Sequence, residues 1–90
     1  MELKEIRGED GLKAELGRGN RFLLFYSRWD PFCVEFKPAY EKIASAAPEQ
    51  YCLVQSEEHP ELAVIYGVET LPSVLFFRSG KLERRLDGVP

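Results

Sequence analysis

The spacing of hydrophobic positions divides the chain into short alternating helices and strands. Leu12 and Leu16, which are four residues apart, predict a helix that begins after Gly8 and ends at Gly17. The apolar run at residues 22–27 is continuous rather than alternating, which is typical of a strand covered on both faces of a sheet. The first third of the chain therefore predicts a helix followed by a buried strand.

The longest predicted helix covers residues 31–47. Pro38 lies inside it and should bend it, because proline removes a backbone donor and crowds the preceding turn. Four bulky apolar residues recur in this segment at helical spacing, and we expect them to face the sheet: Phe32, Phe36, Tyr40 and Ile43.

The remaining segments predict four strands and one short helix. Pro60 suits the first position of a helix that continues to Tyr66, with Gly67 as its cap. Ser79-Gly80 is a hairpin turn between the last two strands. The order β-α-β-α-β-α-β-β predicts an α/β fold with a mixed central sheet and helices on both faces. The four strands are expected at residues 3–6, 51–55, 73–77 and 81–86.

Composition narrows the class of protein. Ninety residues indicate a single domain, 1–90, since two hydrophobic cores would each be too small. Hydrophobic residues make up 44% of the chain and charged residues 30%, which argues against disorder. The net charge of −3 gives no reason to expect nucleic acid or an anionic membrane as a partner, and Arg84-Arg85 indicates only a solvated strand face. No apolar run approaches a membrane span or a signal core, so we expect a cytoplasmic protein.

The segment Trp29-Asp30-Pro31-Phe32-Cys33 connects the buried strand to the long helix. It resembles the active site of the thioredoxin family, in which a tryptophan precedes two cysteines separated by two residues, except that Asp30 stands at the first cysteine position. The resemblance implies a thioredoxin-like fold. Its other features follow in family order along almost the whole chain: Pro38, Tyr66-Gly67-Val68, Leu71-Pro72, Ser79-Gly80 and Gly88.

The resemblance also implies a last helix, which would begin where this sequence ends, at Val89-Pro90. With that helix absent or truncated, we expect one face of the sheet to be poorly covered and to expose an apolar patch. A second copy of the chain would be able to cover such a patch.

The resemblance further implies a substrate groove. In the thioredoxin family a cis proline faces the start of the active-site helix across this groove, and Pro72 matches that proline. Cis X-Pro bonds are uncommon, so one here would be a purposeful feature. Thr70 and Leu71 would then offer backbone groups to an extended peptide. The rest of the groove would be lined by Trp29, Pro31 and Gly88.

Asp30 changes the chemistry that the resemblance implies. The family's reaction needs a thiolate at the first cysteine position, which attacks a substrate disulfide before the second cysteine resolves the mixed disulfide. A carboxylate cannot attack sulfur in this way, so the ordinary two-cysteine cycle is excluded unless another molecule supplies a thiol. Cys33 matches the resolving position, and the neighbouring carboxylate should raise its pKa. The resemblance places Leu24 and Leu53 where the family has a buried acid and a lysine that assist proton transfer.

Structural roles compete with catalytic ones at these positions. Asp30 before Pro31 makes a good helix N-cap, which contributes about 1 kcal/mol, and we prefer that role to a catalytic one. Cys33 is either a packed thiol or a weak one-thiol redox group, and the sequence leaves both open.

Two further residues have structural interpretations. Cys52 lies near the start of the third strand, at the opposite end of the sheet from the active site of this topology. We expect it in the core and not bonded to Cys33, since bridged Cα atoms lie within about 7 Å. His59 has too few potential ligands around it for a metal site and is expected at a solvated helix entry.

Two functions follow from the sequence. In the first, the domain binds a peptide or protein partner through the groove beside Pro72 and does not reduce disulfides. In the second, it is a one-thiol redox protein: Cys33 forms a mixed disulfide with glutathione or a partner protein, or responds to oxidants, in cell redox homeostasis. Neither function calls for a metal or an organic cofactor. The accessibility and reactivity of Cys33 separate the two.

Overall fold

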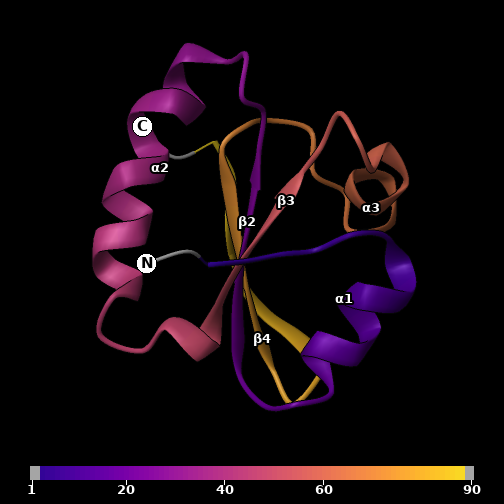
Figure 1. The fold of residues 1–90 in the computed structure, drawn as a ribbon. Helices are drawn as coiled ribbons and strands as arrows, with labels where there is room; N and C mark the ends of the chain where they lie inside the picture. Colours follow the sequence, from indigo (N-terminus) through magenta and orange to yellow (C-terminus); the bar gives the residue numbers. More distant parts are fainter. Residues whose placement is uncertain (1–2, 89–90) are drawn as a thin grey trace.

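The computed structural model describes residues 3–88, which form a five-stranded mixed sheet with helices on both faces (Figure 1). The strands are ordered β1-β3-β2-β4-β5 across the sheet. This architecture confirms the predicted α/β fold. The elements in chain order are β1 Lys4–Glu5, α1 Glu9–Leu16, β2 Arg21–Tyr26, α2 Pro31–Ala44, a 3-10 turn Pro48–Gln50, β3 Tyr51–Gln55, α3 Pro60–Ile65, β4 Ser73–Arg78 and β5 Lys81–Leu86.

The second strand, β2, lies at the centre of the sheet. It runs parallel to β3 and antiparallel to β4, so both of its edges are paired. Leu23, Leu24 and Phe25 are completely buried, which confirms the prediction of a strand covered on both faces. β4 and β5 form the final hairpin, whose turn residues Ser79 and Gly80 have positive φ angles of 51° and 83°. Such angles suit a two-residue hairpin turn.

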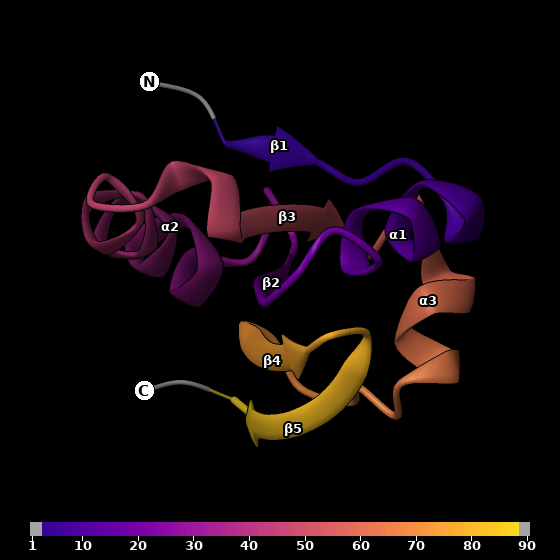
Figure 2. The same ribbon diagram turned by 90° about the horizontal axis from the view of Figure 1, so that it is seen from below.

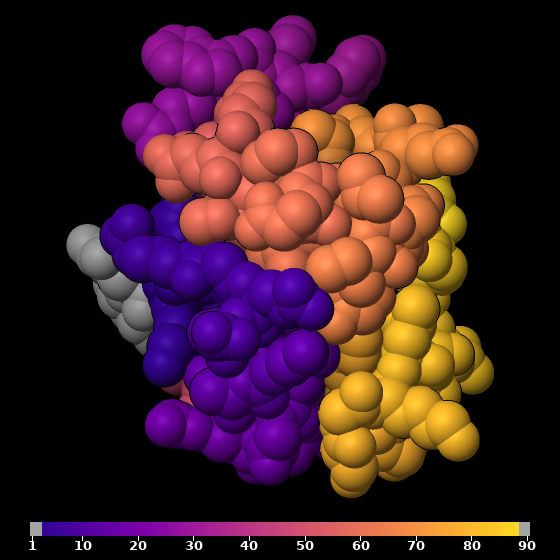
Figure 3. All heavy atoms as spheres, turned by 90° about the vertical axis from the view of Figure 1, so that its right-hand side faces the viewer, coloured from indigo at the N-terminus to yellow at the C-terminus, as the bar shows by residue number. Residues whose placement is uncertain are grey.

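The helices are divided unequally between the two faces of the sheet. α1 and α3 lie on one face, where together with β5 they form a continuous surface (Figure 3). The core beneath them includes Leu12, Phe25, Leu62 and Phe77. On the other face, α2 is the one helix that residues 3–88 provide (Figure 2). A smaller core lies under α2 and includes Cys33.

The face of α2 that packs on the sheet differs from the predicted one. Cys33, Tyr40 and Ala44 are the buried residues of this helix. Phe32 and Ile43 are 67% and 62% exposed, so their prediction as sheet-facing residues was wrong. Each residue turns the chain by about 100° around the helix axis. The buried Cys33 and Ala44 each follow a predicted position by one residue, and they therefore lie on a different side of the helix from Phe32 and Ile43. Apolar spacing predicted the helix but not its rotation.

A buried tyrosine fixes that rotation. The Tyr40 hydroxyl lies 3.0 Å from the carbonyl oxygen of Phe22 on β2 and 2.9 Å from that of Cys52 on β3. These two contacts tie the middle of α2 to two neighbouring strands. The rotation of α2 therefore depends on partners that are distant in sequence.

The end of α2 also differs from the predicted one. The helix ends at Ala44, three residues before the predicted end. Ala47 has left the helical region, with φ −152° and ψ 66°. The cause is Pro48, because proline disfavours helical geometry in the residue before it. Even α2, the longest helix of residues 3–88, lacks the length and apolar character needed to cross a membrane, and so do the others.

Candidate functional site

The start of α2 is capped by the side chain of Asp30. One carboxylate oxygen, Oδ1, accepts hydrogen bonds from the backbone N–H groups of Phe32 at 2.8 Å and Cys33 at 3.2 Å. Pro31 occupies the first helical position, where a missing N–H costs nothing. A cap of this kind contributes about 1 kcal/mol to stability. The N–H groups that could stabilise an anion at this helix end are therefore already bonded to Asp30.

The thiol of Cys33 lies beneath this cap. Its residue is 1% exposed, and neither it nor Cys52 is part of a disulfide. Burial raises the pKa of the Cys33 thiol, and the carboxylates of Asp30 and Glu57 raise it further, although a hydrogen bond with the Ser27 backbone lowers it. A thiol with a raised pKa carries little thiolate near neutral pH, so Cys33 is a weak nucleophile in this conformation.

The surroundings of Cys33 contain two leucines in place of ionisable groups. Leu24 on β2 is paired in register with Leu53 on β3, and both are buried in the same cluster as Cys33. A leucine side chain can neither accept nor donate a proton. These two positions therefore offer no route by which Cys33 would lose its proton.

Cys52 is separated from Cys33 by the sheet. It belongs to the core under α1 and α3, whereas Cys33 belongs to the core under α2. Burial raises the pKa of Cys52 to about 12, and its thiol donates a hydrogen bond to the carbonyl oxygen of Phe22 at 3.3 Å. Cys52 is a core residue, as the sequence predicted.

A cavity of about 470 Å³ borders Cys33 on the side of α2 that faces β1 and β2. The Tyr26 hydroxyl donates a hydrogen bond to the Glu5 carboxylate at 2.9 Å in its wall, and the Lys37 ammonium lies 5.0 Å from the centre of the Tyr26 ring. Sequence reasoning missed these residues because they come from three separate elements. The full lining is Glu5, Tyr26, Ser27, Arg28, Cys33, Val34, Lys37, Pro38 and Glu41.

The loop before β4 brings together several of the predicted groove residues. The Leu71–Pro72 peptide bond is cis. The Ser73 hydroxyl donates a hydrogen bond to the carbonyl oxygen of Thr70 at 2.6 Å and accepts one from the backbone N–H of Gly88 at 3.2 Å. Gly88 has a φ of +65°, and a Cβ atom there would lie 3.0 Å from the Thr70 hydroxyl oxygen. Only glycine fits this close approach without a shift of Thr70.

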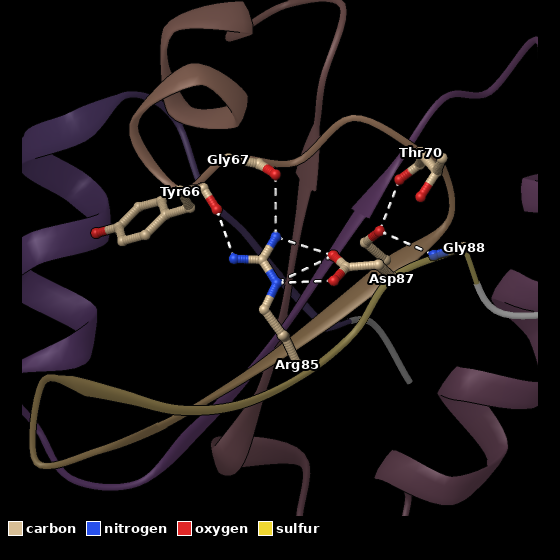
Figure 4. Close-up of polar contacts among 7 residues, drawn as sticks. Tyr66, Gly67, Thr70, Arg85, Asp87 and Gly88 are labelled. Atoms are coloured by element: carbon tan, nitrogen blue, oxygen red, sulfur yellow. Dashed lines mark hydrogen bonds and ion pairs between the residues drawn. The ribbon is translucent and has the colours of Figure 1, made fainter.

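An arginine fixes the other end of the same loop (Figure 4). The Arg85 guanidinium on β5 donates hydrogen bonds to the carbonyl oxygens of Tyr66 at 2.8 Å and Gly67 at 3.1 Å, just after α3. The Asp87 carboxylate holds the guanidinium from its other edge, with the closest contacts at 2.9 Å. Arg85 lies on an exposed strand, as the sequence predicted for Arg84-Arg85, but its guanidinium is bonded to these three groups. No local sequence signal marked its bonds to the end of α3, because those two carbonyl groups are 18 and 19 residues away.

Trp29 and Pro31 lie at the other predicted side of the groove. Both are exposed, Trp29 at 79%. The backbone N–H of Trp29 donates to the Ser27 hydroxyl at 3.2 Å, and that hydroxyl donates to the Glu57 carboxylate. No hydrogen bond within residues 3–88 links Trp29 or Pro31 to the loop around Pro72. A groove between them stays a prediction.

His59 lies at the start of α3, where 21% of its side chain is exposed. Its Nδ1 atom is 3.7 Å from the Glu61 carboxylate. Within the described part of the chain, no three side chains of the metal-binding types cluster around it or elsewhere.

Comparison with known proteins gives a consistent result. A family model described as thioredoxin matches residues 11–89. A putative thioredoxin 2 from Streptomyces coelicolor is 37% identical over 62 residues, which cover 66% of this chain and 46% of that protein. Mouse glutaredoxin-3 is 29% identical over 65 residues, which cover 71% of this chain and 19% of that protein. The chain thus spans less than half the length of either relative.

Solved structures agree on the fold. A thioredoxin from Plasmodium falciparum superposes with a TM-score of 0.91 at 16% identity, covering 98% of this chain and 88% of that one. A mutant thioredoxin from Halobacterium salinarum superposes with a TM-score of 0.90 at 22% identity, covering 99% of this chain and 80% of that one. These likenesses show the shared fold.

Proposed function

Because the chain belongs to the thioredoxin family, we propose that it is a member that binds extended peptides or a protein partner and does not reduce disulfides. Residues 1–90 act as one domain in this proposal. Its main support is Asp30, whose carboxylate accepts the N–H groups of Phe32 and Cys33 at the start of α2. In a member with a cysteine at this position, those N–H groups would stabilise the attacking thiolate. The Asp30 carboxylate, which stands in place of that thiolate, cannot form a mixed disulfide.

The binding element in this proposal is the backbone of the loop before Pro72. Within residues 3–88, no hydrogen bond uses the N–H or the C=O group of Leu71. An extended peptide can pair with free backbone groups of this kind as an added strand does. The bonds made by Ser73 and Arg85 hold the loop at both ends, which reduces the ordering cost of binding.

The side chains at the start of α2 supply the apolar contact. Trp29 exposes 79% of its surface, and Pro31 beside it is also exposed. Aromatic side chains contribute large contact areas in protein interfaces. In this arrangement the peptide backbone pairs with Leu71 while one of its apolar side chains rests on Trp29.

Selection of displayed peptides on the intact chain tests this proposal, with affinities then measured by the fluorescence anisotropy of a labelled peptide. We expect Trp29→Ala to weaken the selected peptides about tenfold or more, which is typical of a central aromatic contact. The matched control is Val64→Ala, because Val64 is 81% exposed on α3. If no peptide is enriched, or if both variants bind equally well, the proposal fails.

A second function has its own support in the cavity that borders Cys33. In that case Cys33 acts as a single redox thiol. Exchange with oxidised glutathione would break its S–S bond, join the Cys33 sulfur to one glutathione and release the other, which leaves as a thiol by taking up the proton that Cys33 loses. Fast modification of Cys33 in the folded protein would favour this function over peptide binding alone.

A further inference from the structure

Three loops meet at the edge of the sheet where Trp29 is exposed. They follow β2, follow β3 and precede β4, and they lie together at the upper end of the sheet in Figure 1. Tyr26, the last residue of β2, pairs with Gln55, the last residue of β3, and the first residue of β4 pairs with Phe25. The three loops therefore leave the sheet at nearly the same level. Residues of each loop would lie beside a peptide that pairs with Leu71.

The Glu57 carboxylate is fixed beside the turn that carries Trp29. One of its oxygens accepts a hydrogen bond from the Ser27 hydroxyl, which itself accepts one from the Trp29 N–H group at 3.2 Å. Its other oxygen accepts from the Gln55 amide at 3.1 Å, with that amide turned so that its own oxygen accepts from Arg28 Nε at 2.7 Å. Gln55 is only 2% exposed, so it holds Glu57 from the buried side. Both partners of Glu57 are neutral groups, and they leave its negative charge uncompensated.

Two more carboxylates on these loops have no cationic partner. Asp30 caps α2 through backbone N–H groups, and Glu69 is exposed on the loop before β4. Within residues 3–88, none of Asp30, Glu57 and Glu69 forms an ion pair. Arg28, on the same loop as Asp30, pairs with Glu58 instead, at 3.7 Å. The edge around Trp29 thus carries three negative charges that no basic side chain of the described residues neutralises.

The thiol beneath this edge experiences the same charges. Burial raises the pKa of Cys33, and the carboxylates of Asp30 and Glu57 raise it further. These two carboxylates are therefore close enough to the start of α2 to oppose a second negative charge there. A cationic group at the same place would be attracted for the same reason.

We propose that the site binds basic peptides, with a lysine or arginine of the partner among Asp30, Glu57 and Glu69 and a neighbouring apolar side chain on Trp29. This inference rests on the proposed function, because it names the class of peptide that the same site takes. The ion pairs formed with the partner displace no ion pair within residues 3–88, so the charge complementarity is not offset by a lost internal contact.

The positions of the carboxylates suit an extended basic peptide. Glu69 lies two residues before Leu71, so a peptide paired with Leu71 reaches it within about two residues of extended chain, roughly 7 Å. Asp30 directly follows Trp29, whose side chain is 79% exposed. The long stem of a lysine or arginine can pack on the indole ring while its charged head reaches a carboxylate. The ring itself also attracts a cation.

Selection of random decapeptides on the intact chain tests this preference. We expect lysine and arginine to be enriched over aspartate and glutamate. Each enriched peptide is then made in a second form, in which glutamine replaces every lysine and arginine, and the affinity of both forms is measured by fluorescence anisotropy. On the wild type the basic form should bind about tenfold more tightly at low salt, and the ratio of the two affinities should fall as salt screens the charges.

Two variants remove the charges without removing the side chains. Glu57→Gln and Glu69→Gln should each lower the affinity ratio about threefold, and the double variant should bring the two forms to within about twofold of each other. The ratio is the readout because a loosened Trp29 turn would weaken both forms alike.

Glu49→Gln is the matched control for the change in charge. Glu49 is exposed on the turn before β3, at the other end of that strand from Glu57. A strand of five residues is about 17 Å long, which exceeds the distance of about 10 Å over which salt screens exposed charges. The affinity ratio should therefore be the same in Glu49→Gln as in the wild type.

The outcomes separate this preference from peptide binding itself. Enriched peptides without an excess of lysine and arginine would overturn the preference and leave the proposed function in place. So would an affinity ratio that Glu57→Gln and Glu69→Gln leave unchanged, or that Glu49→Gln lowers as much as they do. A selection that enriches no peptide would overturn both the preference and the proposed function.

Discussion

At the scale of single residues, one carboxylate sets the chemistry of the site. Asp30 binds the free N–H groups at the start of α2 and lies close enough to Cys33 to raise the pKa of its thiol, in addition to the effect of burial. The same side chain therefore stabilises the helix and suppresses the thiolate beneath it. Helix capping and thiolate stabilisation need the same backbone N–H groups, and in this chain those groups are bonded to the capping carboxylate of Asp30.

The reactivity of Cys33 gives a test at this scale. In a Cys52→Ser background, the rate of alkylation of Cys33 should be slow in the folded chain, with a pH midpoint above the value of about 8.5 for a free thiol. The raised pKa is the reason: less thiolate is present at every pH below the midpoint. Mass spectrometry against pH measures the rate. Fast labelling with a midpoint below that of a free thiol would contradict the expectation and support a redox role.

At the scale of elements, the site depends on how β5 holds the end of α3. The Arg85 guanidinium bonds to two carbonyl groups that follow α3 and to Asp87. The last carbonyl groups of a helix have no partner within it, so these bonds satisfy groups that would otherwise need water. They also fix the first residues of the loop that leads to Pro72.

Removal of this guanidinium should loosen the loop. We expect Arg85→Met to lower the free energy of unfolding by only about 1 kcal/mol, because a third of the Arg85 side chain is exposed to solvent. Amide hydrogen exchange at Gly67 and Val68 should accelerate about fivefold or more, since local opening becomes easier. The control is Arg18→Met, at an exposed position after α1. Equal exchange rates at these amides in both variants would show that Arg85 does not hold the loop.

At the scale of the whole molecule, the buried carboxylate of Glu15 links three elements through ion pairs with two basic residues. Glu15 of α1 accepts a hydrogen bond from the Arg21 guanidinium of β2 at 2.8 Å, and the Lys4 ammonium of β1 lies 3.3 Å from its other oxygen. Burial acts to raise the pKa of Glu15, but the hydrogen bonds and charges of Arg21 and Lys4 together lower it below its ordinary value of 4.5. This carboxylate therefore stays ionised in the folded chain to lower pH than in the unfolded chain.

The pH dependence of stability follows from that shift. A carboxyl group whose pKa is lower in the folded state contributes its full stabilisation above pH 4.5, and this is lost as the pH falls through the folded-state pKa. Glu15→Gln should lower the free energy of unfolding near neutral pH by about 1–3 kcal/mol. It should also make the free energy of unfolding fall less on acidification, because the ionised carboxylate is no longer present to be protonated. Glu9→Gln, at an exposed position of the same helix, should change it by less than about 0.5 kcal/mol. Urea unfolding measured from neutral to acidic pH gives the free energy of unfolding of each variant. If this free energy changes with pH equally in the wild type and in Glu15→Gln, Glu15 is not the source of the pH dependence.

Local patterns in the sequence determined the elements and the identity of the motif. The apolar run at β2, the turn at Ser79-Gly80 and the Asp30-Pro31 helix start were all predictable, because each depends on residues that are neighbours along the chain. The order of the elements then limited the topology to a mixed sheet with helices on both faces. The sequence also places Asp30 at the position that the resemblance assigns to the attacking cysteine, and a carboxylate cannot attack a disulfide.

The tertiary structure decided everything that depends on contacts between distant segments. The rotation of α2 is set by Tyr40 against β2 and β3, so periodicity alone assigned Phe32 and Ile43 to the wrong side. The role of Arg85 depends on carbonyl groups 18 and 19 residues away, and the cavity beside Cys33 is assembled from three elements. A linear pattern records which residues are apolar or charged. Only the folded chain determines which of them meet, because packing brings together groups that the sequence keeps far apart.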